Sequence, residues 1–125
     1  MITIKKRADF VAATNSGKRF ITGTFILQMQ KRSDTHPVKD IARHGFTVTK
    51  KMGNAVIRNR IKRRLREALR KTPERYMLPG HDYVIVSRHK ALMCDFSDLV
   101  RDMEFAFSRI TSMKNAASPS ARTKP

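Results

Sequence analysis

Apolar and polar residues alternate with period two in three stretches of the chain, and this period predicts β-strands. The longest stretch covers residues 20–30, and Gly23 within it marks a bulge or a bend. The other two cover residues 45–49 and 82–88. Each is short enough to be one strand of a small sheet.

Apolar residues recur every three or four positions in three other stretches, which predicts amphipathic helices. A short helix precedes residues 15–17, where an Asn-Ser-Gly sequence is a typical helix stop. A longer helix begins at Asn54, a candidate N-cap, and continues to about Thr72. The last covers residues 95–110, with Asp95 as its candidate cap.

Along the chain the predicted elements follow the order helix, strand, strand, helix, strand, helix. This order predicts an α+β fold, and a length of 125 residues allows a single small domain, which we place over residues 1–112. Residues 113–125 have no apolar period and carry basic side chains, so we expect a disordered tail there.

The charge of the chain restricts the possible functions more than the predicted fold does. The chain has 27 Lys and Arg against 10 Asp and Glu, a net charge of +17, and such a surface favours polyanions. No stretch of about 18 apolar residues is present, so we expect no membrane span. A single cysteine, Cys94, and the lack of a signal peptide indicate a reducing, cytoplasmic location.

Over half of the net charge lies in residues 50–71, which contain ten Lys or Arg and one acid, Glu67. At 100° per residue, Asn59, Arg63, Arg66 and Arg70 form a stripe opposite the apolar face. Arg60, Arg64 and Lys71 widen the stripe on one flank, Lys62 widens it on the other, and Arg58 lies near the apolar edge. Guanidinium groups in this density suit phosphate oxygens, whereas a merely solvated face would mix both signs.

Just before this helix, Lys50 and Lys51 precede Gly53, which lets the backbone approach a ligand closely. The helix N-terminus adds free N–H groups that favour anions. The run Thr47-Val48-Thr49-Lys50-Lys51-Met52-Gly53-Asn54-Ala55-Val56-Ile57-Arg58-Asn59-Arg60-Ile61-Lys62-Arg63-Arg64-Leu65-Arg66-Glu67 resembles the signature of the bacterial ribonuclease P protein component, with Arg58-Asn59-Arg60 as its "RNR" motif. The order of elements over about residues 5–112 resembles that family too.

The resemblance implies a ribosomal-protein-like sandwich with a left-handed βαβ crossover, where general rules favour the right-handed one. It also implies a subunit that binds a catalytic RNA, which hydrolyses the 5′ leader from precursor tRNA with magnesium held mainly by the RNA. Catalytic groups would lie on the RNA, and no second protein partner is called for. The residues implied to face the catalytic RNA are Arg58, Asn59, Arg60, Lys62, Arg63 and Arg66.

The resemblance further implies a cleft for the single-stranded leader, with Lys50 and Lys51 where the cleft meets the basic helix. Phe10 matches the family's aromatic residue in the first helix, although a core role for Phe10 stays open. Thr14 and Gln28 stand where the family often has further aromatic residues. Leader recognition in this chain is therefore expected to use hydrogen bonds and phosphate contacts more than stacking.

Three other function classes remain as alternatives. The first is a structural RNA-binding protein of the ribosomal type, which the charge and element order also allow. The second is a DNA-binding protein that inserts the basic helix in a major groove, although that helix has few side chains suited to reading bases. The third is a metal-dependent nuclease, which the scattered histidines and helical acids do not favour.

Overall fold

The computed structural model describes residues 2–3, 17–32, 36–37 and 40–112. Five strands form one mixed sheet in the order β1-β4-β5-β3-β2. Strands β1, β4 and β5 run parallel, whereas β3 pairs antiparallel with both β5 and β2. The strands are β1 Ile2–Thr3, β2 Lys18–Ile21, β3 Phe25–Lys31, β4 Arg43–Thr47 and β5 His81–Ser87.

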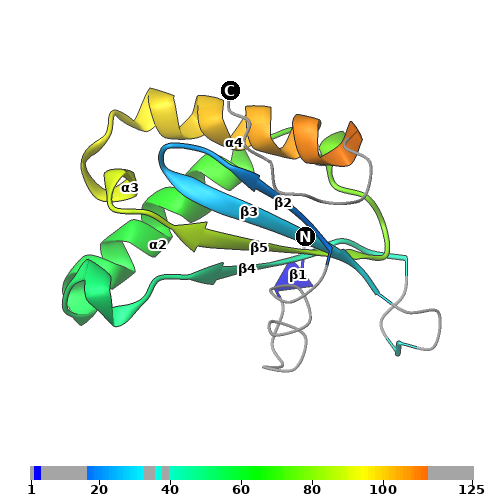
Figure 1. Cartoon of the computed structure of the whole chain (residues 1–125), viewed down its shortest axis with the longest axis horizontal. Helices are drawn as coiled ribbons and strands as arrows, with labels where there is room; N and C mark the ends of the chain where they lie inside the picture. The colour runs from blue at the N-terminus through cyan, green and yellow to red at the C-terminus, as the bar shows by residue number, and fades with distance from the viewer. Residues whose placement is uncertain (1, 4–16, 33–35, 38–39, 113–125) are drawn as a thin grey trace.

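Helices cover one face of this sheet (Figure 1). The two long helices, α2 and α4, cross that face, and a short helix, α3, lies beside α2. Two 3-10 turns, η1 and η2, flank α2 along the chain. The bounds are η1 Lys50–Met52, α2 Ala55–Arg70, η2 Glu74–Tyr76, α3 Lys90–Met93 and α4 Phe96–Ser112. The predicted first helix lies outside the described residues.

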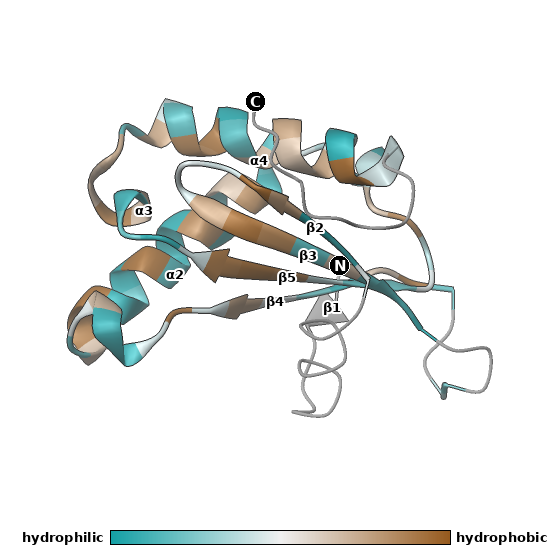
Figure 2. Cartoon of the chain, viewed as in Figure 1, coloured by the Kyte–Doolittle hydropathy of each residue, from teal (hydrophilic) through white to brown (hydrophobic). Residues whose placement is uncertain are grey.

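The hydrophobic core lies between the sheet and the two long helices, and Figure 2 shows hydrophobic stretches along β3, β5 and both helices. Leu27 and Ile85 from the sheet are fully buried, as are Leu65 of α2 and Phe107 of α4. The ring of Tyr83 lies 5.0 Å from that of Phe107, and its hydroxyl accepts a hydrogen bond from the backbone of the loop before β5. Burial of these side chains fixes α2 on the sheet by its apolar stripe.

The stretch predicted as one strand, residues 20–30, is a hairpin of two strands, β2 and β3. The chain reverses at residues 22–24, so Gly23 marks a tight turn within this stretch. The hydroxyl of Thr22 accepts hydrogen bonds from the backbone N–H groups of Thr24 and Phe25, at 3.2 and 3.0 Å. This local bonding competes with strand continuation and explains why the period-two pattern hid the turn.

The parallel unit β4–α2–β5 is the crossover expected from the sequence. Its helix begins after Asn54, whose side-chain oxygen accepts a hydrogen bond from Ile57 N–H at 3.0 Å, so the predicted N-cap is confirmed. The α+β class is confirmed as well. The left-handed sense of the crossover stays a prediction of the resemblance, and the short elements β1 and α3 were not predicted.

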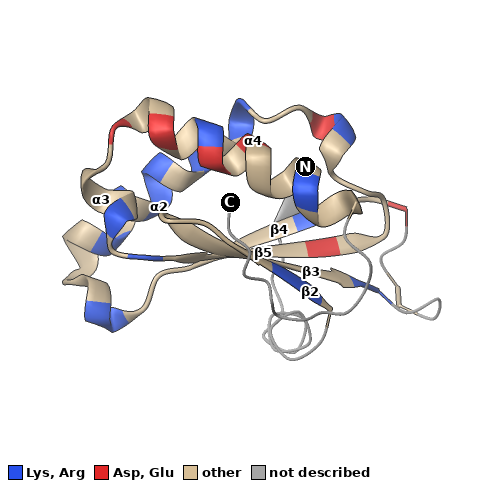
Figure 3. Ribbon diagram, turned by 45° about the horizontal axis from the view of Figure 1, so that its top comes forward, with Lys and Arg blue, Asp and Glu red and all other residues tan. Residues whose placement is uncertain are grey.

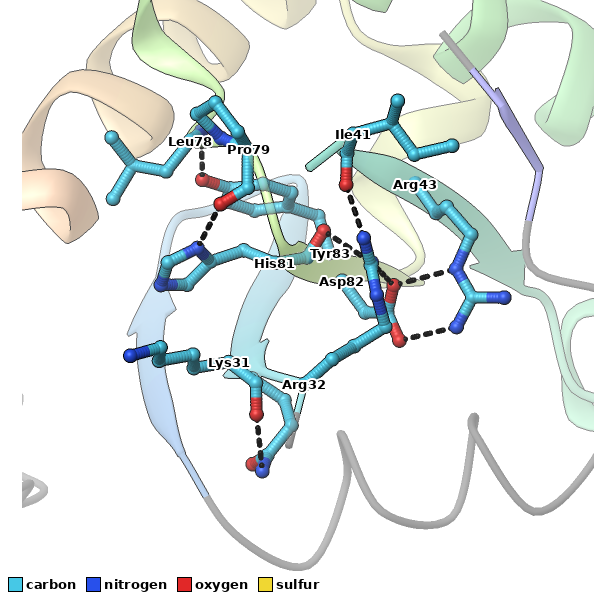
Figure 4. Close-up of polar contacts among 10 residues, drawn as sticks. Lys31, Arg32, Ile41, Arg43, Leu78, Pro79, His81, Asp82 and Tyr83 are labelled. Carbon is cyan, nitrogen blue, oxygen red and sulfur yellow. Dashed lines mark hydrogen bonds and ion pairs between the residues drawn. The ribbon is translucent and has the colours of Figure 1, made fainter. Parts of the chain in front are cut away.

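A buried ion cluster joins three strands at the end of the sheet opposite the hairpin turn (Figure 4). The carboxylate of Asp82, at the start of β5, accepts from Arg32 at 2.5 Å and twice from Arg43 at 2.8 Å. Arg32 also donates to the backbone carbonyls of His81 and Ile41. The cluster fixes both ends of the connection between β3 and β4 to β5.

Candidate nucleic-acid interface

Helix α2 lies on the core with one face and exposes the other. Ile61, Leu65, Ala68 and Leu69 are buried against the sheet and α4. The side chains on the opposite face point to solvent, and Figure 3 shows the basic residues along this helix. The exposed residues of the predicted stripe are Asn59, Arg60, Arg63, Arg66 and Arg70. We call this set the basic face of α2.

Two arginines of this helix are exposed and available to bind a ligand. Within the part of the chain that the structure describes, Arg60 and Arg63 have no hydrogen-bond or ion-pair partner, and the half-buried Lys62 has none either. Among the described residues, their cationic groups are therefore not engaged in a protein contact. A phosphate can accept two parallel N–H bonds from such a guanidinium without breaking a protein contact.

Other cations of α2 already have partners. Arg66 lies over the ring of Phe46 on β4, 5.9 Å from the ring centre, and Arg70 pairs with Glu67 at 2.9 Å. The Nε of Arg58 donates to the carbonyl of Gly53 at 3.2 Å, so this half-buried side chain folds back on the turn before the helix. These contacts restrict the orientation of the three guanidinium groups.

Arg64 differs from the prediction that it widens the basic stripe. Its guanidinium donates to the carbonyl of Ala91 at 2.9 Å and to the carbonyl of Cys94, and it lies 3.5 Å from the Cys94 sulfur. The side chain therefore ties α3 to α2 as an internal contact. Sequence spacing could not reveal this, because the partner carbonyls lie in a short helix about 30 residues further along the chain.

The turn before α2 presents the paired lysines. Lys50 and Lys51 form η1 and are exposed. Gly53 follows with a φ of +139°, and a Cβ at this position would lie 3.0 Å from the side chain of Ile57. Only glycine fits this conformation without strain. Because this short turn separates η1 from α2, the two lysines lie directly beside the helix N-terminus.

The other residues predicted to contact the leader are Phe10, Thr14 and Gln28. Phe10 and Thr14 lie outside the described residues. Gln28 lies on β3, on the opposite side of the strand from the core residues Leu27 and Met29, and only 5% of its surface is exposed. The structure therefore brings Lys50 and Lys51 to the basic face of α2, while Gln28 lies within the sheet.

Next to the basic face, His44 of β4 is buried, whereas the sequence had indicated a surface residue that could touch RNA. Its ring packs against that of Phe46 at 5.3 Å, and its Nδ1 has no hydrogen-bond partner among the described residues. Burial, with nearby positive charge that includes Arg66, lowers the pKa of His44 from 6.5 to about 4. The imidazole is therefore neutral at physiological pH and adds no charge to the interface.

Two other features are absent from the described part of the chain. No three side chains of His, Cys, Asp or Glu gather there in a way that could hold a metal ion. None of its helices is both long and apolar enough to span a membrane.

Comparison with known proteins gives one consistent result. The Ribonuclease P family model matches residues 2–111. The ribonuclease P protein component of Brucella suis is 45% identical over 107 residues, covering 82% of this chain and 75% of that protein. The corresponding protein of Bartonella quintana is 47% identical over 102 residues, covering 80% of this chain and 76% of that protein.

Solved structures agree with the sequence relatives. The RNase P protein of Staphylococcus aureus superposes with a TM-score of 0.71 at 28% identity, covering 92% of this chain and 99% of that one. The RNase P protein of Thermotoga maritima also gives a TM-score of 0.71, at 26% identity, covering 87% of this chain and 97% of that one. The family match spans nearly the whole described fold, including the basic helix and the turn that precedes it, and this chain belongs to the ribonuclease P protein family.

Proposed function

We propose that this chain binds the catalytic RNA of ribonuclease P through the basic face of α2 and helps that RNA to remove the 5′ leader of precursor tRNA. The observation that carries the proposal is the pair of exposed guanidinium groups of Arg60 and Arg63, which have no partner among the described residues and stand on a helix whose other face is buried in the core. Binding of RNA phosphates there releases condensed counterions, which favours association at low salt.

The polar residues of α2 would make different kinds of contact with the RNA. Arg60, Arg63 and Lys62 supply cations to phosphate oxygens, and the exposed amide of Asn59 suits a base edge or a ribose hydroxyl. Arg58 and Arg66 are oriented by Gly53 and Phe46 and would add contacts at the two rims. This arrangement suits a helix that contacts mainly the phosphate backbone of a folded RNA and does not read its base sequence.

The leader of the precursor would pass the turn at Lys50 and Lys51, with Phe10, Thr14 and Gln28 as further predicted contacts. The exposed ammonium groups of η1 lie beside the helix N-terminus, and both favour the phosphates of a single strand. The chemistry itself would be carried by the RNA with its magnesium ions, and the protein would lower the magnesium needed by neutralising phosphate repulsion between the two RNAs.

The test is cleavage of a precursor tRNA by the cognate catalytic RNA at low magnesium, with the protein, without it, and with the protein alone. We expect cleavage at the leader junction only when both components are present. Cleavage by the protein alone would place the catalytic groups on this chain and contradict the proposal. Absence of any enhancement would favour a structural RNA-binding role for the basic helix.

A further inference from the structure

An aromatic ring lies under one of the arginines of α2, on the flank of the helix that faces β4. The guanidinium carbon of Arg66 lies over the ring of Phe46, 5.9 Å from the ring centre. Phe46 pairs in register with Ile85 of β5, so its backbone is held inside the sheet. Its ring also packs against the ring of His44 in an edge-to-face arrangement, at 5.3 Å. Phe46 therefore keeps a fixed position under an exposed cation.

This flank of α2 is rich in positive charge. Arg58, Lys62 and Arg66 are spaced four residues apart, and this spacing places them along one side of the helix. The contact of Arg66 with Phe46 shows that this side lies next to β4. Among the described residues, neither Lys62 nor Arg66 forms an ion pair with an acidic side chain. The flank can therefore bind a polyanion without breaking a salt bridge within that part of the chain.

A guanidinium that lies over an aromatic ring can still bind a second planar group. The guanidinium is flat and weakly hydrated, so one of its faces can lie on the ring of Phe46 while the other face stays open. In RNA recognition, unpaired bases stack on aromatic side chains and on guanidinium planes. The N–H groups at the edge of the same guanidinium remain able to donate to a phosphate.

We propose that Phe46 and Arg66 form a stacking subsite for one unpaired base of the catalytic RNA, with the phosphate next to that base held by Lys62. This inference rests on the proposed function and adds a contact with a base, which phosphate binding by Arg60 and Arg63 does not include. Phe46 is a positioning residue, because it holds the guanidinium on which the base lies. Every base has a flat face, so the subsite accepts any base and reads no sequence.

The place of the subsite on α2 favours the catalytic RNA as its ligand. At a rise of about 1.5 Å per residue, Arg66 lies roughly 18 Å along the helix from the N-cap Asn54. Lys50 and Lys51, where the leader would pass, lie before that N-cap. Arg63, by contrast, is within one helical turn of Arg66. An RNA that docks on the basic face of α2 therefore reaches the subsite directly.

The experiment measures the affinity of the full chain for its folded catalytic RNA at several salt concentrations. Phe46→Leu removes the ring and keeps an apolar side chain, whereas Phe46→Tyr keeps the ring. Arg66→Lys keeps the charge and removes the guanidinium plane. The matched control is Phe105→Leu, because the ring of Phe105 also lies under a guanidinium, that of Arg109, at 4.8 Å. Phe105 packs against Phe20 of β2, away from the basic face of α2.

A fully paired RNA duplex is the second ligand, because its bases are stacked on one another and cannot enter the subsite. The melting temperature of each variant checks that it folds. The double variant Phe46→Leu/Arg66→Lys tests whether the ring and the guanidinium act through the same contact.

We expect Phe46→Leu and Arg66→Lys each to bind the catalytic RNA about fivefold more weakly, as for loss of one stacking contact. The dependence on salt should stay that of wild type, because neither change removes a positive charge. The double variant should bind no more weakly than Arg66→Lys alone. Phe46→Tyr and Phe105→Leu should bind like wild type, and the affinity for the duplex should be the same in all variants.

An unchanged affinity of Phe46→Leu for the catalytic RNA would overturn the proposal. An equal loss of affinity for the duplex would overturn it too, because the effect would then lie in phosphate contacts. So would losses that add fully in the double variant, since the ring and the guanidinium would then act separately. Failure of the wild-type protein to bind the catalytic RNA or to enhance cleavage would instead reject the proposed function.

Discussion

Two neighbouring arginines on α2 serve different purposes, although both are basic residues of one helical turn. Arg63 is exposed on the basic face, whereas the guanidinium of Arg64 donates to Ala91 and Cys94 on the neighbouring α3 segment. Successive residues are 100° apart on a helix, so a single step turns the side chain from solvent to a neighbouring element. Their substitutions should therefore have separable effects.

We expect Arg63→Ala to lower the slope of the logarithm of catalytic-RNA affinity against the logarithm of salt by about one unit, with unchanged protein stability. Arg64→Ala should keep the slope of wild type and lose about 1–2 kcal/mol of unfolding free energy, because it removes charged hydrogen bonds to carbonyls. Binding titrations at several salt concentrations and urea unfolding measure the two effects. Equal slopes for wild type and Arg63→Ala would remove Arg63 from the interface.

His44 predicts a pH dependence of stability. The pKa of this side chain is about 4 in the fold, against 6.5 as its ordinary value, and its surface is only 9% exposed. Above pH 6.5 the residue is neutral in both states. As the pH falls from 6.5 toward 4, the unfolded chain binds the proton first, so the free energy of unfolding decreases by about 3 kcal/mol over this interval.

Urea unfolding of wild type and His44→Leu at a series of pH values isolates this contribution. The variant should show a weaker decrease between pH 6.5 and 4, whatever its stability at neutral pH. The matched control is His89→Leu, which removes an exposed histidine in place of the buried one. Parallel curves for wild type and His44→Leu would show that His44 titrates normally in the fold.

Helices and caps that arise from a local sequence pattern could be predicted from the sequence. The second helix and its Asn54 cap follow from apolar spacing and capping chemistry, and the structure confirms them. The β2–β3 turn was hidden because Thr22 and Thr24 continue an alternating pattern while their hydroxyls bond within the turn. The short β1 was missed because two residues contain no period.

Contacts between distant residues were beyond the reach of pattern reasoning. Arg32 lies outside every element predicted from the sequence, yet it is 7% exposed and bonded to Asp82, 50 residues later. No spacing rule connects these positions, because their approach depends on the antiparallel pairing of β3 with β5.

The charge of the whole molecule is unevenly distributed. Basic residues lie along η1, α2 and α3, whereas α4 carries several acidic residues (Figure 3). Those acids are Asp98, Asp102 and Glu104. The negative side chains on α4 repel phosphates, so the field of the protein turns its basic side toward RNA during approach.

The same excess of charge opposes folding of the free protein. A net charge of +17 on 125 residues raises the free energy of the compact state through self-repulsion, and the exposed cations of η1 and α2 bring much of this charge together. Anions that bind the folded state relieve the repulsion and stabilise it by mass action. Sulfate and phosphate resemble the phosphodiester that we expect at the basic face of α2.

We expect the melting temperature to rise by several degrees, as an order of magnitude, across tens of millimolar sulfate or phosphate. Sodium chloride at matched ionic strength is the control, because it screens charge without a multivalent contact, and it should raise the melting temperature less. Removing Arg60 and Arg63 together should reduce the response to sulfate, since two cations that gather the anion are lost. An unchanged melting temperature over this range of anion would show that repulsion contributes little, and an equal effect of chloride would show that screening alone relieves it.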